Sequence, residues 1–253
     1  MISTVPTNYT AAPNLLRDRV ILVTGAGDGI GRAAAIAFAA HGATVILLGK
    51  TIKKLEAVYD EIEDAGYPQA AIYPMKLGGA KADDYTALHD VIETEFGRLD
   101  GLLHNAGALG QRKNIQDTTD ADWNEVISVN LTSNFMLTKA LLPLLRNSED
   151  ASIVFTSSSV GRKGRAFWGA YAVSKFGVEG LAQVLADELD TTTNIRVNCI
   201  NPGATNTAMR RIAYPAELPS VNPMPEQIMG AYLYLIGADS KGVTGKSFDA
   251  LSK

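Results

Sequence analysis

The stretch "RVILVTGAGDGIGRAAA" (residues 19–35) joins a short apolar run to a glycine-rich turn and then to a segment with helical periodicity. The apolar run is almost continuous and rich in valine, isoleucine and leucine, which favours a strand buried on both faces, as in a parallel sheet. Glycines between such a strand and a helix permit a tight turn. This order of elements is typical of the first strand–turn–helix unit of an open α/β sheet.

The alternation of short apolar runs and amphipathic segments continues along the chain. Further runs of strand type lie at 43–49, 70–75, 99–105, 151–157 and 194–201, and helical periodicity is found at 29–41, 51–65, 82–96, 121–145 and 168–190. No internal repeat or linker interrupts the pattern. The sequence therefore predicts a single Rossmann-type α/β domain, with a doubly wound parallel sheet of about seven strands and helices on both faces.

Two stretches fall outside this alternation. Residues 1–17 are expected to form an N-terminal arm that precedes the Rossmann domain at 18–253. Residues 202–225 look irregular and hold five of the ten prolines. Because they follow a strand, at the edge where open sheets bind their ligands, we expect a substrate lid around 207–225.

The composition excludes several classes of partner. The net charge of −4 and the pI of about 5.4 disfavour broad attraction to nucleic acid or to an anionic membrane. No apolar run reaches the ~18–20 residues needed to span a bilayer, and the N-terminus does not look like a signal peptide. Cys199 is the only cysteine, which excludes an internal disulfide. We expect a cytoplasmic protein that binds neither nucleic acid nor a membrane.

The glycine-rich turn has the spacing G-x-x-x-G-x-G, formed by Gly25, Gly29 and Gly31, with Ile30 between the last two. Glycines let the backbone approach a ligand closely, and the N-terminus of the following helix offers free N–H groups to a pyrophosphate. A glycine turn without a ligand is the alternative. The strand before the turn and the helix after it favour the phosphate-binding interpretation.

The end of the second strand bears on the choice between the two nicotinamide dinucleotides. In such folds an acidic residue at this place binds the ribose 2′-hydroxyl. Here "LLGKT" (47–51) offers Gly49 and the cation Lys50, which would attract a 2′-phosphate. Asp28 in the glycine turn lies where many NADP-preferring relatives carry a basic residue, and so disfavours NADP(H). Lys50 could instead be the solvated start of a helix. The balance favours NADP(H) over NAD(H).

The stretch "WGAYAVSK" (168–175) places Tyr171 and Lys175 four residues apart, on one face of a helix. A cation about 4 Å from a phenol, at an effective dielectric constant of about 20, is worth roughly 4 kcal/mol, or about three pKa units, before the opposing effect of desolvation. Ser158 ends the preceding strand, where its hydroxyl can hold a substrate oxygen beside the phenol. The alternatives are a polar helix surface and a serine that only forms a turn.

Several motifs in this order resemble the short-chain dehydrogenase/reductases in their compact single-domain form. "TGAGDGIG" (24–31) is similar to the cofactor loop of that family, "HNAG" (104–107) to its N-N-A-G motif and "NPGATNT" (201–207) to its P-G segment. The stretches "FTSSSVGR" and "GRAFWGAY" further resemble the YciK-like bacterial oxidoreductases. The resemblance covers residues 15–250, roughly the whole chain.

The resemblance implies two sets of site residues, and the scattered histidines give no reason to expect a metal site. The implied catalytic residues are Asn130, Ser158, Tyr171 and Lys175. The implied cofactor-binding residues are Gly25, Gly29, Ile30, Gly31, Lys50, Asn105, Ala106, Gly107, Tyr171, Lys175, Pro202, Gly203 and Thr207. In this family the threonine that matches Thr207 contacts the nicotinamide carboxamide.

The implied reaction is reversible hydride transfer between the nicotinamide of NADP(H) and a small-molecule carbonyl or secondary alcohol. Tyr171 would act as general acid/base, Lys175 would lower its pKa and bind ribose hydroxyls, and Ser158 would polarise the substrate oxygen. Asn130 would hold a proton-relay water. The alternatives are a 3-oxoacyl thioester reductase and a cofactor-binding scaffold or redox sensor without turnover. The family also implies a homodimer or homotetramer, with helices 121–145 and 168–190 as candidate interfaces.

Some positions depart from the family or carry charge without an assigned role. His104 stands where asparagine is usual, and we expect a structural role because the three histidines are scattered without a cluster of carboxylates. Lys76 lies near the position of an aspartate that contacts adenine in relatives. Arg162, Lys163 and Arg165 lie close to the site, where they either attract an acidic substrate or form a solvated basic loop.

Overall fold

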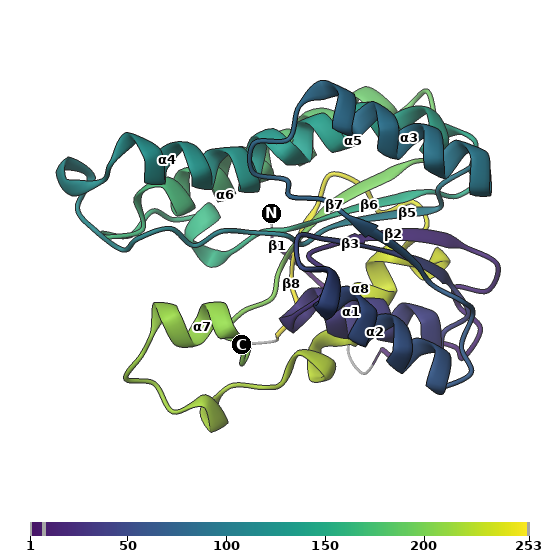
Figure 1. Ribbon diagram of the computed structural model, residues 1–253, viewed down its shortest axis with the longest axis horizontal. Coiled ribbons are helices and arrows are strands. Elements are labelled where there is room, and N and C mark those ends of the chain that lie inside the picture. Colours follow the sequence, from purple (N-terminus) through teal and green to yellow (C-terminus); the bar gives the residue numbers. More distant parts are fainter. Residues whose placement is uncertain (1, 7–8, 252–253) are drawn as a thin grey trace.

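The computed structural model describes residues 2–6 and 9–251. These residues form one sheet in which every pair of neighbouring strands is parallel, in the order β1-β8-β7-β6-β5-β2-β3-β4 (Figure 1). The strands are β1 (Ile2–Thr4), β2 (Val20–Thr24), β3 (Thr44–Gly49), β4 (Ala71–Pro74), β5 (Gly101–His104), β6 (Ser152–Thr156), β7 (Arg196–Asn201) and β8 (Ser247–Asp249). The predicted parallel α/β sheet is confirmed, with eight strands where about seven were expected.

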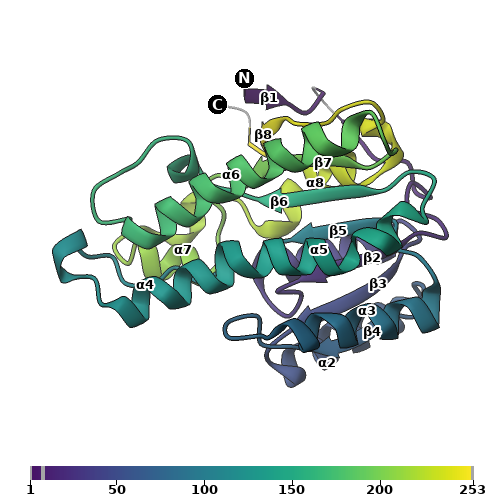
Figure 2. The same cartoon turned by 90° about the horizontal axis from the view of Figure 1, so that it is seen from above.

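Helices cover both faces of the sheet (Figures 1 and 2). One face carries α3 (Ala82–Phe96), α5 (Ser133–Arg146) and α6 (Gly169–Asp190), with α4 (Asp120–Ile127) leading into α5. The other face carries α1 (Gly29–Ala40), α2 (Ile52–Asp64) and α8 (Met229–Ile236). The short helix α7 (Ala208–Ala213) stands apart from the sheet. No helix in the described part of the chain is long and apolar enough to cross a membrane.

The central strands are covered on both sides. β2 is buried at all five of its positions. Successive side chains of a strand point to opposite faces. Ile21 and Val23 accordingly join the core under α1 and α8, while Val20 and Leu22 join the core under α3, α5 and α6. This double burial explains why the sequence shows continuous apolar runs instead of alternating ones.

The winding of the chain reverses direction at β2. This strand pairs with β3 on one side and with β5 on the other, so the carboxyl ends of β2 and β5 are neighbours. In open α/β sheets the crevice outside such ends is where ligands bind. The glycine loop follows β2 and the "HNAG" segment ends β5. The two motifs therefore meet at this crevice.

The structure differs from the sequence-based expectation in its short and irregular parts. Residues 2–4 of the arm form β1, which pairs with β8, and Leu16 of the arm is fully buried in the core. The expected helix 121–145 is divided by a π-helical turn at Ser128–Thr132. The helices α7 and α8 have no counterpart among the predicted elements. β1, α7 and α8 are too short to give a periodic signal in the sequence. The π-turn adds one residue to a helical turn, which barely changes the hydrophobic pattern.

Candidate active site

The glycine loop packs directly against the segment that follows β5. Gly25 has a φ of +68°, a left-handed conformation that favours glycine, and a Cβ there would lie 3.0 Å from the Cα of Ala106. A Cβ on Gly31 would collide with the carbonyl oxygen of Gly25. Because α1 begins at Gly29, its first N–H groups are free of helical partners beside the crevice. This is the cradle that a pyrophosphate requires.

A threonine at the end of β2 ties the loop to β5. The hydroxyl oxygen of Thr24 accepts hydrogen bonds from the backbone N–H groups of Asn105 (2.9 Å) and Ala106 (3.0 Å). The side-chain amide of Asn105 in turn donates to the carbonyl oxygen of Thr24 (3.2 Å). Thr24 could not be recognised from the sequence, because threonine is an ordinary strand residue and carries no signal of its own.

His104 is buried beneath the crevice. Its Nε2 lies 2.8 Å from the hydroxyl of Thr138, and its ring stacks on Phe155 with a centroid distance of 4.5 Å and an interplanar angle of 6°. Burial lowers the pKa of His104 to about 3. The imidazole is therefore neutral at physiological pH and packs as part of the core.

One of the other histidines does lie beside carboxylates, contrary to expectation. His89, Asp90 and Glu93 on α3 hold their potential ligand atoms within 4.8 Å of one another. Asp90 and Glu93 are exposed, and none of the three lines the crevice. Exposed acidic groups of this kind are ordinary on a helix surface, so we assign no function to the cluster.

Helix α6 brings Tyr171 and Lys175 to the crevice, one turn apart. The ammonium of Lys175 lies 5.7 Å from the centroid of the Tyr171 ring and donates a hydrogen bond to the carbonyl oxygen of Thr156 at 2.7 Å. Ser158 follows β6, and its hydroxyl oxygen accepts a hydrogen bond from the N–H of Val160 at 3.4 Å. The tyrosine, the lysine and the serine thus line the same cleft.

Burial, and not the neighbouring cation, dominates the proton affinity of Tyr171. Burial raises the pKa of Tyr171 to about 12, and the hydroxyl of Ser158 acts in the opposite direction. Burial also lowers the pKa of Lys175 to about 8, against the attraction of Cys199 and Glu179. The expected net lowering of the phenol's pKa is not found, because desolvation of the phenol leaves its pKa above the ordinary value of 10.

Asn130 lies in the π-helical turn and is fully buried. Its side-chain oxygen accepts a hydrogen bond from the N–H of Ala108 (2.7 Å), and its amide donates to the carbonyl of Ala108 (2.9 Å) and to the hydroxyl of Ser174 (3.0 Å). The amide of Asn134 donates to the backbone carbonyl of Asn130 (2.9 Å). Asn130 therefore joins the segment after β5 to α6, and π-turns of this kind are frequent at functional sites.

The expected cofactor-binding residues converge on one cleft of about 610 Å³. All but one of them line it: Gly25, Gly29, Ile30, Lys50, Asn105, Ala106, Gly107, Tyr171, Lys175, Pro202, Gly203 and Thr207. Ser158 lines it as well, whereas Gly31 and Asn130 are not among the described residues of its wall. A cleft of this size suits a cofactor or a small molecule.

The part of the cleft where β3 and β4 end is rich in lysine. Lys50, Lys54 and Lys76 all line it, with Asp28 among them. Lys54 forms an ion pair with Asp28, and the hydrogen bond from Lys54 is the main reason that the pKa of this carboxyl is lowered. The ammonium of Lys54 thus offsets the negative charge of Asp28, which would otherwise disfavour a 2′-phosphate. Lys54 could not be recognised from the sequence, because a lysine in the first turn of a helix is an ordinary surface residue.

Arg162 is a structural residue and not part of a solvated basic loop. Its guanidinium lies 2.6 Å from the carboxylate of Asp249 and 3.4 Å from that of Glu179, and its side chain is only 17% exposed. It therefore ties the turn after β6 to β8 and α6. Of the three basic residues in this stretch, Lys163 and Arg165 are the exposed ones.

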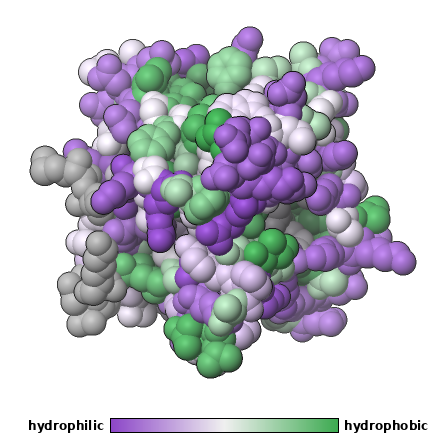
Figure 3. All heavy atoms as spheres, turned by 90° about the vertical axis from the view of Figure 1, so that its left-hand side faces the viewer, coloured by the Kyte–Doolittle hydropathy of each residue, from purple (hydrophilic) through white to green (hydrophobic). Residues whose placement is uncertain are grey.

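The expected lid segment contains α7, which forms one side of the cleft. The lid residues that line the cleft are Thr207, Ala208, Met209, Arg210, Ile212, Ala213 and Tyr214. Trp168, just before α6, has its ring centroid 6.0 Å from that of Tyr214 and 5.6 Å from that of Tyr171. Figure 3 shows the side of the molecule that carries α4 and α7, where apolar and hydrophilic side chains lie next to one another.

A parallel α/β sheet with a glycine-rich cleft at the carboxyl ends of its strands is the arrangement of the dinucleotide-binding Rossmann proteins. Within that class the chain belongs to the short chain dehydrogenases, because the model of this family matches residues 19–217. It is thus an oxidoreductase that acts on the CH–OH/C=O couple.

Individual relatives agree with this family over almost the whole chain. The oxidoreductase YciK of Escherichia coli strain K12, which its name marks as uncharacterized, is 50% identical over 243 residues, 96% of each chain. A structure from Pseudomonas syringae is 57% identical with a TM-score of 0.96, and the match covers 98% of this chain and 100% of that one. A structure from Shigella flexneri 2a strain 301, in complex with NADP, is 50% identical with a TM-score of 0.92 over 94% and 99% of the two chains. The resemblance to YciK-like members of the family is confirmed.

Proposed function

We propose that this chain is an NADP(H)-dependent oxidoreductase that transfers a hydride between nicotinamide and a carbonyl or secondary alcohol, with Tyr171 as general acid/base. The observation that carries the proposal is that Ser158, Tyr171 and Lys175 line the same cleft as the glycine loop. The cofactor, when bound, supplies the hydride chemistry. The protein supplies alignment and electrostatics.

Each side chain has a distinct task in this proposal. Tyr171 gives its proton to the carbonyl oxygen during reduction and takes it back during oxidation. Ser158 donates a hydrogen bond to the same oxygen and stabilises the charge that develops there. Lys175, with a pKa of about 8, remains mostly charged at pH 7 and binds ribose hydroxyls. Asn130 holds the proton-relay water and fixes the segment beside the catalytic helix.

The preference for NADP(H) rests on the lysines beyond β3. Lys50 and Lys76 line this part of the cleft, and Lys54 neutralises Asp28 there. A 2′-phosphate therefore meets a positive surface. The related Shigella flexneri protein, which is 50% identical, was crystallised with NADP. Thr207 caps α7 by accepting a hydrogen bond from the N–H of Arg210 (3.1 Å), which holds it near the nicotinamide side of the cleft.

The proposed assembly is a cytoplasmic homodimer or homotetramer. Large apolar side chains are exposed by 46–55% on α5 and α6: Phe135, Val173, Phe176 and Val184. These two helices are the expected interfaces, and exposed apolar residues on them suit burial against a second copy.

Replacing Tyr171 with Phe tests the proposed reaction. We expect lost turnover of carbonyl substrates and retained binding of NADPH, measured by cofactor fluorescence, because the phenyl ring keeps the shape of the cleft. Tyr67→Phe, outside the cleft, serves as the matched control. Unchanged turnover of Tyr171→Phe would refute the role of the phenol. Turnover confined to acyl-carrier thioesters would favour a 3-oxoacyl thioester reductase, and cofactor binding without any turnover would favour a scaffold or redox sensor.

A further inference from the structure

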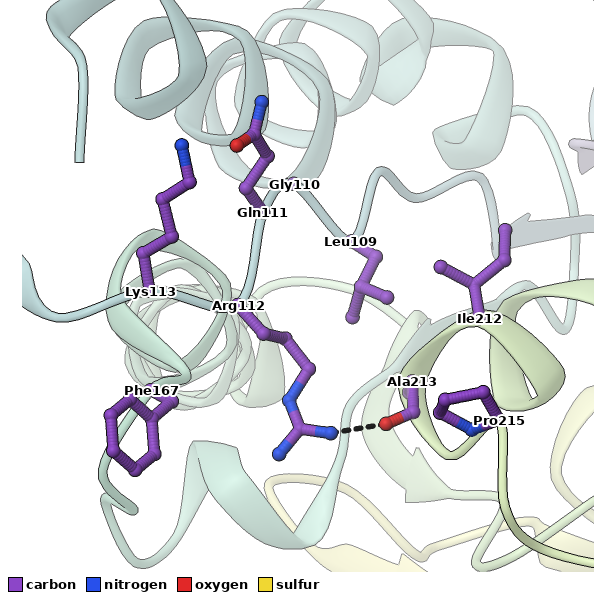
Figure 4. Close-up of a pocket in the computed structure, with 9 residues that line it drawn as sticks. All are labelled: Leu109, Gly110, Gln111, Arg112, Lys113, Phe167, Ile212, Ala213 and Pro215. Carbon is purple, nitrogen blue, oxygen red and sulfur yellow. Dashed lines mark hydrogen bonds between the residues drawn. The ribbon is translucent and has the colours of Figure 1, made fainter. Parts of the chain in front are cut away.

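Arg112, in the segment between β5 and α4, reaches across the mouth of the cleft to the lid. Its guanidinium lies 4.7 Å from the centroid of the Trp168 ring and 5.2 Å from that of Tyr214. It also donates a hydrogen bond to the carbonyl oxygen of Ala213, at the end of α7 (Figure 4). The ring of Trp168 lies 5.6 Å from that of Tyr171. One indole ring therefore separates a fixed cation from the proposed proton donor.

This cation has no carboxylate to neutralise it in the described part of the chain. Among the ion pairs within 4.0 Å that residues 2–6 and 9–251 form, none involves Arg112. Arg210 offers a direct comparison, because it lies 3.8 Å from the same Tyr214 ring but pairs with Glu217 at 2.6 Å. Stacking on aromatic rings fixes a guanidinium without cancelling its charge. With one backbone carbonyl bound, Arg112 keeps most of its five N–H donors for a ligand.

A second cavity, of about 540 Å³, adjoins the cleft at Arg112. It shares Leu109, Ile212 and Ala213 with the cleft, and its other lining residues are Gly110, Gln111, Arg112, Lys113, Phe167 and Pro215. Figure 4 shows Arg112 pointing across this cavity, with Phe167 and Lys113 on one side and Ile212 and Pro215 on the other. The lining includes two cations and, among the described residues, no acid. The cavity therefore combines apolar walls with a positive charge.

We propose that Arg112 is a specificity-determining residue that selects carbonyl substrates with an oxyanion, a carboxylate or phosphate, remote from the reacting carbonyl. This inference rests on the proposed function, because it takes Tyr171 as the place of the reacting oxygen. The planar guanidinium binds two oxygens of such a group through parallel N–H···O bonds. A neutral substrate that covers Arg112 leaves its charge without a partner, so the same residue disfavours neutral competitors.

The test compares matched acids and esters. Methyl ketones that end in a carboxylate, with one to five methylene groups between the two functions, are reduced in parallel with their methyl esters at saturating NADPH. We expect the kcat/KM of the acids to exceed that of the esters at the length that spans from Tyr171 to Arg112. In Arg112→Met the acid-to-ester ratio should fall roughly 10- to 100-fold, mainly through KM of the acid. Arg112→Lys should restore part of this ratio.

The neighbouring cation provides the control. Lys113→Met removes the same charge from the same cavity, but from a side chain without aromatic stacking, and should change the acid-to-ester ratio less than about threefold. An equal fall in Lys113→Met and Arg112→Met would overturn the assignment to Arg112, since a diffuse positive field would then explain it. A second comparison measures kcat/KM for dihydroxyacetone phosphate and for dihydroxyacetone, and so distinguishes selection of a phosphate from selection of a carboxylate.

Binding without turnover separates this inference from the proposed reaction. The chain has two tryptophans, so in a Trp123→Phe background the emission reports on Trp168, the neighbour of Arg112. Titration of the NADP⁺ complex with 4-oxopentanoate should change this emission, with an affinity about tenfold weaker or more in Arg112→Met. If the protein binds the oxyanion through Arg112 but reduces no carbonyl, the result would support the Arg112 oxyanion site and refute the proposed hydride transfer. If the wild type and Arg112→Met turn over substrates with the same acid-to-ester ratio of kcat/KM, the result would refute the Arg112 oxyanion site and support the proposed hydride transfer.

Discussion

The ammonium of Lys175 donates a hydrogen bond to the carbonyl oxygen of Thr156 at 2.7 Å, which anchors α6 on the end of β6. Lys175 is only 4% exposed. Taking an ammonium out of water is unfavourable, and this is why its pKa is lowered to about 8. The helix thus carries a buried cation that the proposed reaction needs and that the folded state accommodates at a loss of stability.

Replacing Lys175 with Met is expected to abolish turnover and to stabilise the protein. Methionine has a similar length and no charge to desolvate, so the free energy of unfolding at pH 7 should rise by about 1–2 kcal/mol. The folded-state pKa of Lys175, about 8, lies below its ordinary value of 10.5, so the wild type gains stability as the pH rises between them. The advantage of the variant should therefore shrink in that window.

Urea unfolding at pH 7 and at pH 9.5 measures both effects. The exposed Lys139→Met on α5 is the control and should change the free energy of unfolding by less than about 0.5 kcal/mol. A Lys175→Met protein that is less stable than the wild type at pH 7 would mean that the hydrogen bond to Thr156 outweighs the desolvation of the ammonium.

His104 is expected to make the protein lose stability as the pH falls. Its pKa is about 3 in the folded protein and 6.5 ordinarily, so below pH 6.5 protons bind preferentially to the unfolded chain. Between pH 6.5 and pH 5 this amounts to about 2 kcal/mol. His104→Asn has no imidazole to take up a proton on unfolding. Acidification should therefore lower the free energy of unfolding of the wild type by about 2 kcal/mol more than that of the variant. Urea unfolding at the two pH values measures it, and a constant difference would argue against a buried, neutral imidazole.

Lys50 and Lys54 are expected to affect NADPH binding by different routes. Lys50→Ala removes a cation beside the proposed 2′-phosphate position and should weaken NADPH roughly tenfold, and NADH by less than about twofold. Lys54→Ala leaves the carboxylate of Asp28 without its partner, so it should also weaken NADPH. Adding Asp28→Asn should restore most of the affinity lost in Lys54→Ala, but none of that lost in Lys50→Ala. Calorimetry with both cofactors measures this, and a Lys54→Ala loss that persists in the double variant would show that Lys54 acts on the ligand directly.

The fold could be predicted where burial leaves a pattern in the sequence. The strand at 20–24 is covered on both faces, and its apolar run is visible in the residues themselves. β1 and β8 have three residues each. β1 is the edge strand and pairs with β8, which in turn pairs with β7, and no local pattern shows these long-range relations. The π-turn around Asn130 likewise leaves no local pattern, and the side chain of Asn130 bonds to Ala108 and Ser174, which are distant in the sequence.

The site could be predicted where the chemistry demands a residue type at a fixed spacing. Glycine at 25 and 31, and tyrosine and lysine one helical turn apart, are such cases. The sequence could not show which distant side chains become neighbours: Arg112 reaches Ala213 across 101 positions. Burial is also a property of the whole fold. The spacing of Tyr171 and Lys175 is visible in the sequence, but the desolvation that makes the net shift of the phenol's pKa upward is not.

Arg162 is expected to be one of the most sensitive positions for stability. Its guanidinium is the common partner of Glu179 and Asp249, whose side chains are only 10% and 20% exposed. Arg162→Met would leave both carboxylates nearly buried without this cation, which should lower the free energy of unfolding by about 3 kcal/mol. Adding Glu179→Gln should recover part of the loss, because the two side chains are coupled. Urea unfolding beside the exposed Arg146→Met control, expected within about 0.5 kcal/mol of the wild type, measures this. An Arg162→Met protein as stable as that control would show that the ion pairs joining the turn after β6 to α6 and β8 contribute nothing to the fold.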